Sequence, residues 1–223
     1  MNFISAVIFD MDGVIVHSNP THKVILREFC AKHDQELTDQ QLLEKVYGRT
    51  NQDWIPNVFG DVSQEVITAF ADEKEAMFRE AFDPQANVVP GLYEFLDLLD
   101  ENDIKMVVAT SAPKENAEYI LSELNITDRF EAVLSSADVQ NSKPHPEPYL
   151  KGAKVAGADP ANCIVIEDSI SGVKSGLAAG SKVIGIATTH THEEMSDCHL
   201  VVDDFTSLNL ESLEEIMELQ PNK

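Results

Sequence analysis

The stretch "VIFDMDGVIV", Val7 to Val16, runs from apolar residues into two carboxylates and then becomes apolar again. The apolar residues before Asp10 predict a buried β-strand, so that Asp10 and Asp12 follow directly after its end. Burying a carboxylate is costly unless it is paired or holds a metal ion, and neighbouring like charges oppose each other's ionisation. We therefore expect the rest of the chain to bring a compensating charge to these two acids.

Further apolar runs suit buried parallel strands, and helical patterns lie between most of them. The predicted strands are Ala6–Phe9, Met106–Ala109, Ala132–Leu134, Cys163–Ile166, Val183–Ile186 and Leu200–Val202. The stretch "GLYEFLDLLDEN" illustrates the helices between them, because its Leu92, Phe95, Leu96 and Leu99 share one face. Strands that alternate with helices predict an α/β fold, a Rossmann-like parallel sheet covered on both faces.

One region breaks this alternation. From about Asn19 to Pro84 only helical patterns occur, roughly four of them, with no strand between. This predicts a small α-helical domain, residues 19–84, inserted into a core made of residues 1–18 and 85–223. We expect Trp54 and Phe59 in the hydrophobic core of the insert.

The chain has 223 residues and a formal net charge of −23. So acidic a protein is unsuited to nucleic acid and to anionic membranes, which both need basic surfaces. The first residues lack the basic region of a signal peptide, and no apolar stretch approaches the roughly 18 residues of a membrane helix. Cys30, Cys163 and Cys198 are far apart, which suggests neither a disulfide framework nor a zinc site. We expect a cytoplasmic monomer.

Ligands of an open parallel sheet bind outside the carboxyl ends of its strands, so the residues after each strand are candidates for a site. These are Asp10 and Asp12 after the first strand, Thr110 and Ser111 after "MVVA", Lys143 in "SKPHPEPY", and Glu167 and Asp168 after "CIVI". Four carboxylates need a cation to share a pocket, and Mg²⁺ prefers oxygen ligands together with phosphate. A lysine and a hydroxyl beside that ion suit a tetrahedral oxyanion, so the set predicts phosphoryl transfer.

The motifs "DMDGV", "TS", "SKP" and "IEDSISG", in this order, resemble those of the haloacid dehalogenase superfamily. Within it, the chain is similar to the beta-phosphoglucomutase-like phosphatases that carry a helical cap. The resemblance covers nearly the whole chain. It implies a Rossmann-like core with an inserted cap and a Mg²⁺-dependent phosphatase that acts on a small phosphorylated substrate.

The resemblance also implies roles for the residues after the strands. Asp10 would attack phosphorus to form an aspartyl-phosphate and would also ligate Mg²⁺. Asp12 would act as general acid and base, and its backbone carbonyl would ligate the metal. Lys143 would neutralise developing charge and steady Asp10.

Three further roles come from the same resemblance. Thr110 would bind a phosphoryl oxygen, helped by the amide of Ser111, although this pair could also cap a helix. Asp168 would ligate Mg²⁺, and Glu167 would do so directly or through water. Gly172, like Gly13 after the first strand, would allow close backbone approach.

Candidates for substrate contact lie in the insert. In "YGRTN", Tyr47 to Asn51, the side chains of Arg49, Thr50 and Asn51 belong to a loop that faces the catalytic edge in this family. Arg49 is a fork-shaped donor for an anionic group. His22 resembles a family position near the hinge, where this chain also has His17 in place of the usual acid.

Other functions remain open from the sequence. A beta-phosphoglucomutase is the main alternative, although the cap arginine of such enzymes would fall near Asn51 and Arg49 is two residues early. A metal-independent dehalogenase, a phosphonate hydrolase with a cap lysine, and a non-catalytic binding protein fit fewer residues. His190 and His192 in "TTHTHEE" are expected to be exposed loop residues rather than a metal pair.

Overall fold

The computed structural model describes residues 4–46 and 50–219. The chain divides into two compact units, Met1–His17 with Pro84–Lys223 and Ser18–Asp83. We call them the core unit and the cap unit and describe each by itself. Among the described residues, no helix is long and apolar enough to cross a membrane.

A six-stranded sheet forms the centre of the core unit, and all its pairings are parallel. Its strands are β1 (Ala6–Phe9), β2 (Lys105–Ala109), β3 (Ala132–Leu134), β4 (Cys163–Glu167), β5 (Lys182–Ile186) and β6 (Leu200–Val202). They lie in the order β3-β2-β1-β4-β5-β6. The predicted Rossmann-like α/β fold is therefore confirmed, with strand ends that differ by at most one residue from the sequence prediction.

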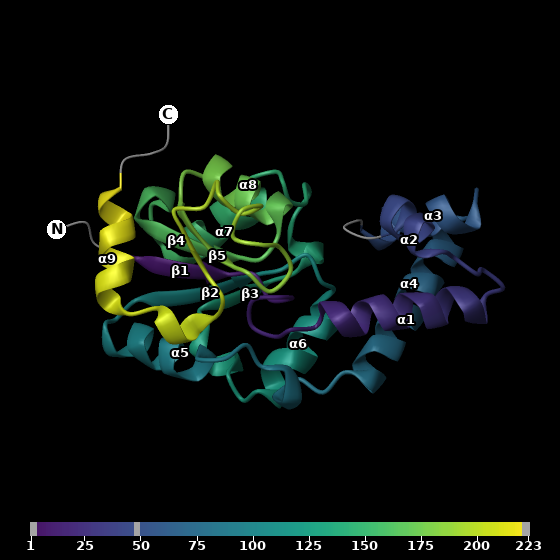
Figure 1. Ribbon diagram of the computed structural model, residues 1–223, viewed down its shortest axis with the longest axis horizontal. Coiled ribbons are helices and arrows are strands. Elements are labelled where there is room, and N and C mark those ends of the chain that lie inside the picture. Colours follow the sequence, from purple (N-terminus) through teal and green to yellow (C-terminus); the bar gives the residue numbers. More distant parts are fainter. Residues whose placement is uncertain (1–3, 47–49, 220–223) are drawn as a thin grey trace. The chain divides into compact units, whose positions relative to one another are not determined.

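Helices cover both faces of this sheet, with α7 and α8 on one side and α5 and α6 on the other (Figure 1). The core helices are α5 (Leu92–Glu101), α6 (Lys114–Glu123), α7 (Glu147–Ala156), α8 (Ile170–Ala178) and α9 (Leu210–Glu218), with short 3₁₀ turns η1 (Gln85–Asn87), η2 (Thr127–Arg129), η3 (Ser136–Asp138), η4 (Pro160–Asn162) and η5 (Phe205–Ser207). Side chains of β1 alternate between the faces. Ile8 packs in a buried cluster with Tyr149 of α7, whereas the ring of Phe9 lies 6.1 Å from that of Phe95 in α5.

The strand order reverses between β1 and β4, which places a ligand crevice at their carboxyl ends. Phe9 pairs with Ile166, and the N–H of Asp10 continues the ladder by donating to the Ile166 carbonyl at 2.9 Å. Asp10 follows β1 and Glu167 ends β4. The sheet itself therefore brings these two acids together.

The two chain segments that connect the units pair with each other inside the core unit. Val16 forms an antiparallel bridge with Val88. The backbone N–H of His17 donates to the Asn87 carbonyl at 2.8 Å. The buried Nδ1 of His17 has no hydrogen-bond partner among the described residues. The segments that precede and follow residues 18–83 are thus paired with each other.

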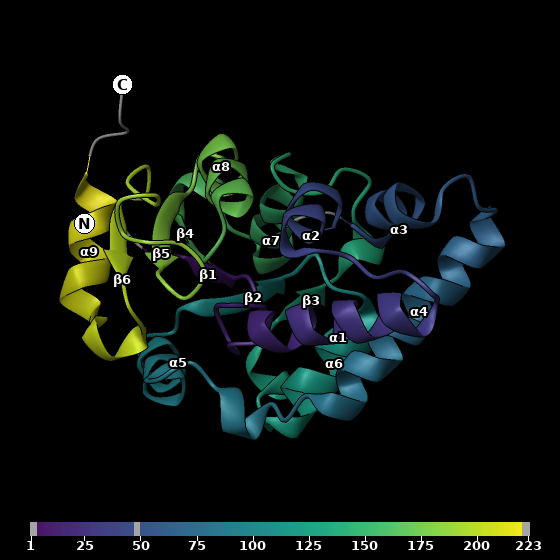
Figure 2. The same ribbon diagram turned by 45° about the vertical axis from the view of Figure 1, so that its right-hand side comes forward.

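The cap unit is helical, with α1 (Asn19–Lys32), α2 (Asp39–Lys45), α3 (Asn51–Phe59) and α4 (Gln64–Ala81). Helix α1 runs along α4 (Figure 2). Its Phe29 lies at the centre of the cap core, 5.9 Å from the Trp54 ring, 6.1 Å from that of Phe59 and 5.5 Å from that of Phe70. Trp54 is 2% exposed and Phe59 half-buried, in agreement with the core positions expected from the sequence.

Candidate active site

Lys143 links the acids at the ends of β1 and β4. Its Nζ donates to Oδ1 of Asp10 at 2.6 Å and to Oε1 of Glu167 at 2.7 Å. The Lys143 side chain is only 5% exposed, and those of Asp10 and Glu167 are 10% and 0% exposed. This ammonium is the compensating charge that the sequence led us to expect beside Asp10.

Both oxygens of Glu167 are occupied by donors of the protein. Besides Lys143, Oε1 accepts the hydroxyl of Tyr149 at 2.6 Å. Oε2 accepts the N–H of Asp168, the N–H of Ser169 and the Ser169 hydroxyl at 3.1, 3.0 and 2.9 Å. Five donors therefore hold this carboxylate in one position.

Close packing reinforces that position. A Cβ added to Gly172 would lie 1.7 Å from Oε1 of Glu167, so a glycine is required beneath the carboxylate. The Lys143 Nζ lies 4.9 Å from the centre of the Tyr149 ring, within the range of a cation–π contact. Ser175 of α8 donates to the His145 carbonyl at 2.6 Å and so ties the loop of Lys143 to that helix.

A second group of contacts surrounds Asp168 and the turn after β1. Asp168 is 3% exposed, and one of its oxygens, Oδ2, accepts the hydroxyl of Thr189. Asp12 lies in a tight turn in which Gly13 has φ +82°, a left-handed conformation that favours glycine. The Gly13 carbonyl accepts the Thr188 hydroxyl at 2.5 Å.

Thr110 and Ser111 follow β2 as predicted. The Thr110 N–H continues the β2–β3 ladder to the Leu134 carbonyl at 2.9 Å, and its side-chain oxygen accepts the N–H of Ala112 at 3.0 Å. Thr110 is buried and Ser111 is exposed. Helix α6 has Pro113 at its N-cap without a side-chain cap bond, so the alternative that this pair caps a helix does not hold.

Burial and like charge shape the electrostatics of these groups. Burial raises the pKa of Asp10 to about 7 against the opposing effect of Lys143, and burial with the Glu167 charge raises the pKa of Asp168. For Glu167, burial also acts upward, but Lys143 and the hydroxyl of Tyr149 outweigh it and lower the pKa. The pKa of Lys143 is raised, because its two carboxylates outweigh burial. Lys143 is thus held in its charged form, while burial opposes ionisation of Asp10 and Asp168.

In the cap unit, two of the candidates from the sequence belong to one hydrogen-bonded cluster. Lys74 donates to Oε1 of Glu75 at 2.8 Å and lies 3.2 Å from Nδ1 of His22. Because an ammonium can only donate, this nitrogen of His22 is the acceptor. Asn51 donates to the same Glu75 oxygen at 3.0 Å and accepts the indole N–H of Trp54 at 2.8 Å.

Residues 7–186 match the sequence profile described as "Haloacid dehalogenase-like hydrolase". The chain belongs to this family. Glycerol-1-phosphate phosphohydrolase 1 of Saccharomyces cerevisiae is 30% identical over 217 residues, which cover 93% of this chain and 85% of the yeast protein. Beta-phosphoglucomutase of Bacillus subtilis is 28% identical over 223 residues, with 96% of each chain covered. The predicted resemblance is confirmed.

Solved structures of haloacid dehalogenase-like hydrolases share the whole fold. A HAD hydrolase of family IA, variant 3, from Entamoeba histolytica superimposes with a TM-score of 0.89 at 26% identity. The match covers 96% of this chain and all of the other, 100%. The core with its inserted helices is therefore the architecture of a known member.

The acids present suit the magnesium ion that such hydrolases use. Asp10, Glu167 and Asp168 each offer an oxygen, and these oxygens lie within 4.8 Å of one another. When all three carboxylates are ionised, they carry two more negative charges than Lys143 balances, and a divalent cation would balance these two charges. An all-oxygen donor set is the kind that Mg²⁺ prefers.

The structure also adds residues that the sequence alone did not single out in this hydrolase. Tyr149, Thr188 and Thr189 contact the predicted site residues, yet they come from helix α7 and from the loop after β5. The sequence signal for these threonines is a pair of hydroxyl residues shortly after a predicted strand, at the start of "TTHTHEE". His190 and His192 lie beside surface carboxylates, Glu194 at 3.6 Å and Asp203 at 2.8 Å.

The remaining cap candidates are Thr50 and Arg49, and no described contact joins Thr50 to the Lys74–Glu75 cluster. Thr50 is exposed and donates to Asp53 at 2.7 Å, and Arg49 lies outside the described residues.

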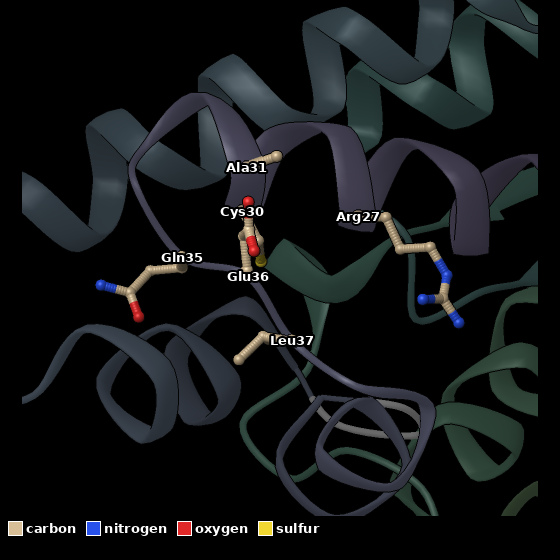
Figure 3. Close-up of a pocket in the computed structure, with 6 residues that line it drawn as sticks. All are labelled: Arg27, Cys30, Ala31, Gln35, Glu36 and Leu37. Atoms are coloured by element: carbon tan, nitrogen blue, oxygen red, sulfur yellow. The ribbon is translucent and has the colours of Figure 1, made fainter.

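A cavity of about 190 Å³ lies at the end of α1 (Figure 3). Its volume is below the roughly 300 Å³ at which ligand pockets begin. Its Cys30 is a buried thiol whose pKa burial raises to about 11, so it stays protonated at neutral pH.

Proposed function

We propose that this chain is a Mg²⁺-dependent phosphatase that hydrolyses the phosphate ester of a small polyol or sugar through an aspartyl-phosphate on Asp10. The observation that carries the proposal is the buried Lys143, held between Asp10 and Glu167 at the carboxyl ends of β1 and β4. The curated relatives support the same class, since the yeast protein is named for hydrolysis of glycerol 1-phosphate.

The reaction has two steps. In the first, a carboxylate oxygen of Asp10 bonds to phosphorus while the ester P–O bond breaks, and Asp12 gives a proton to the departing oxygen. In the second, Asp12 takes a proton from water, whose oxygen bonds to phosphorus while the bond to Asp10 breaks. Inorganic phosphate leaves, and both aspartates return to their starting states.

Other residues of the core unit orient the phosphoryl group. Thr110 and the amide of Ser111 bind its oxygens, and Lys143 neutralises the charge that develops on them. Asp10, Asp168 and the carbonyl of Asp12 would hold Mg²⁺, which when bound supplies positive charge beside the phosphoryl oxygens.

Glu167 takes a supporting role in this scheme. The sequence left direct and water-mediated ligation open. Five protein donors already engage its two oxygens, which favours ligation through water and makes Glu167 chiefly the anchor of Lys143.

For the cap unit, we assign Arg49, Thr50, Asn51 and His22 to contacts with the non-phosphate part of the substrate. The Lys74–Glu75 pair holds two of them, Asn51 and His22, in place. We further expect a cytoplasmic protein, because all three cysteines are buried free thiols, as is usual in a reducing compartment. For the oligomeric state we propose a monomer.

A beta-phosphoglucomutase is the second candidate, favoured by the match to the Bacillus subtilis enzyme over 96% of both chains. A mutase must hold a bisphosphate by both ends. At the position where its cap arginine would fall, this chain has Asn51, an uncharged side chain that offers no positive charge to a second phosphate. This residue type favours transfer to water over transfer to a second sugar oxygen.

The test is phosphate release with Mg²⁺ across a panel of polyol phosphates, sugar phosphates and pyrophosphate. Beta-glucose 1-phosphate is followed in parallel for conversion to glucose 6-phosphate. We expect release from a few small esters, abolished by EDTA and by Asp10→Asn. Isomerisation without release would establish the mutase, and full activity of Asp10→Asn would reject the aspartyl-phosphate.

A further inference from the structure

Two adjacent threonines after β5 reach two different parts of the site. The hydroxyl of Thr188 donates to the Gly13 carbonyl at 2.5 Å, next to Asp12. The hydroxyl of Thr189 donates to Oδ2 of Asp168. One short loop therefore restrains the turn that follows β1 and the acid that follows β4 at the same time.

The backbone of this loop is itself fixed. The N–H of Ala187 donates to the Val202 carbonyl at 2.8 Å, which extends the pairing of β5 with β6. The N–H of Thr188 turns back to the Ile186 carbonyl at 2.9 Å. A hydroxyl on so constrained a segment can hold its partner in a defined orientation.

We infer that Thr189 is a positioning residue that sets how Asp168 presents its oxygens to the cation and so favours Mg²⁺ over Ca²⁺. The inference rests on the magnesium site of the proposed function. Mg²⁺ demands near-octahedral geometry, whereas Ca²⁺ accepts about six to eight oxygens and readily takes both oxygens of one carboxylate. Because Oδ2 already accepts the Thr189 hydroxyl, binding of a cation through both oxygens of Asp168 would make this oxygen share its lone pairs and would weaken the hydrogen bond.

The test measures metal binding without substrate, by titrating the metal-free full-length protein with MgCl₂ and, separately, CaCl₂ in a calorimeter. Removing a hydrogen-bond partner of a metal ligand typically weakens affinity by about 10- to 100-fold. We expect Thr189→Val to raise the Kd for Mg²⁺ at least about tenfold and the Kd for Ca²⁺ clearly less. Thr189→Ser keeps the hydroxyl and should restore both values.

Thr191 provides the matched control, since it lies in the same loop and bonds only to Glu194 among the described contacts of its side chain. Thr191→Val should bind both ions like the wild type. Thr189→Ala repeats the test should valine disturb folding. If the wild type binds Mg²⁺ and Thr189→Val has unchanged Kd values, or loses affinity equally for both ions, the inference is wrong and the proposed function stands. A wild type that binds no Mg²⁺ would overturn the proposed function and the inference with it.

Discussion

The ammonium nitrogen of Lys143 lies 2.6 Å from Oδ1 of Asp10, although 133 positions of the chain separate them. The same nitrogen lies 2.7 Å from Oε1 of Glu167. The ammonium of Lys143 thus joins the loop after β3 to the ends of β1 and β4. Its positive charge compensates the buried carboxylates of Asp10 and Glu167.

Lys143→Met replaces this ammonium with an apolar side chain and leaves Asp10 facing Glu167. Removing one partner from a buried ion pair costs about 3–5 kcal/mol. We expect a fall of this order in the free energy of unfolding of the metal-free protein, measured with urea, together with loss of phosphate release. The control is Lys114→Met at an exposed pair with Glu118, where the urea midpoint should move far less. Equal midpoints for the two variants would contradict the assigned role.

Tyr149→Phe removes the hydroxyl that donates to Oε1 of Glu167 and keeps the ring beside Lys143. The Glu167 oxygen then loses one donor, so the carboxylate that anchors Lys143 is held less firmly. We expect kcat to fall about tenfold, equivalent to about 1.4 kcal/mol, with KM nearly unchanged. Tyr93→Phe is the matched control, because within the described part of the chain the Tyr93 hydroxyl makes only a long contact of 3.5 Å, to the Leu124 carbonyl. An effect confined to KM would argue against positioning of Lys143.

Gly172→Ala should destabilise the core unit even though alanine favours helices. The added Cβ would lie 1.7 Å from Oε1 of Glu167, a side chain that five donors prevent from moving. We expect a lower melting temperature and loss of activity. Glu167→Ala removes the obstructing group, so Gly172→Ala should cost little stability in that background. Additive effects of the two substitutions would disprove the clash.

The cap should lose stability in acid through Glu75. Burial acts to raise its pKa, but the charge of Lys74 and the hydrogen bond from Asn51 outweigh burial and lower the pKa below the ordinary value of 4.5. A carboxyl with a lowered folded-state pKa stabilises the fold above about pH 4.5 and loses this contribution as the pH falls through its folded value. Urea unfolding between pH 6 and 3 should show this loss, and Glu75→Gln should flatten the curve. The same acid dependence in both proteins would assign it to other groups.

The sheet and the acids of the site could be predicted because both follow from local patterns. Buried parallel strands read as short apolar runs, and residues such as Asp10 and Asp168 come directly after them. Once the strands are known to be parallel, their carboxyl ends meet at one edge, and no further information is needed to bring these acids together.

The supporting contacts could not be predicted in the same way. Tyr149 reaches Glu167 across 18 positions, and Thr188 reaches Gly13 across 175, so neither pair has a signal in sequence spacing. Nor could the sequence predict that both oxygens of Glu167 accept hydrogen bonds from protein groups. These bonds depend on the turn at Ser169 and on the close approach of Gly172 to the carboxylate. Arg49, the clearest cap candidate from its chemistry, lies outside the described residues.

The pairing of Val16 with Val88 makes residues 18–83 an exchangeable module. An insertion whose two ends leave the host domain together can be replaced without altering the connectivity of that host. Replacing the insert between these two ends therefore leaves unchanged the strand ends that carry Asp10 and Asp168. For protein engineering, the bridge between these two valines marks where a graft from a relative should begin and end.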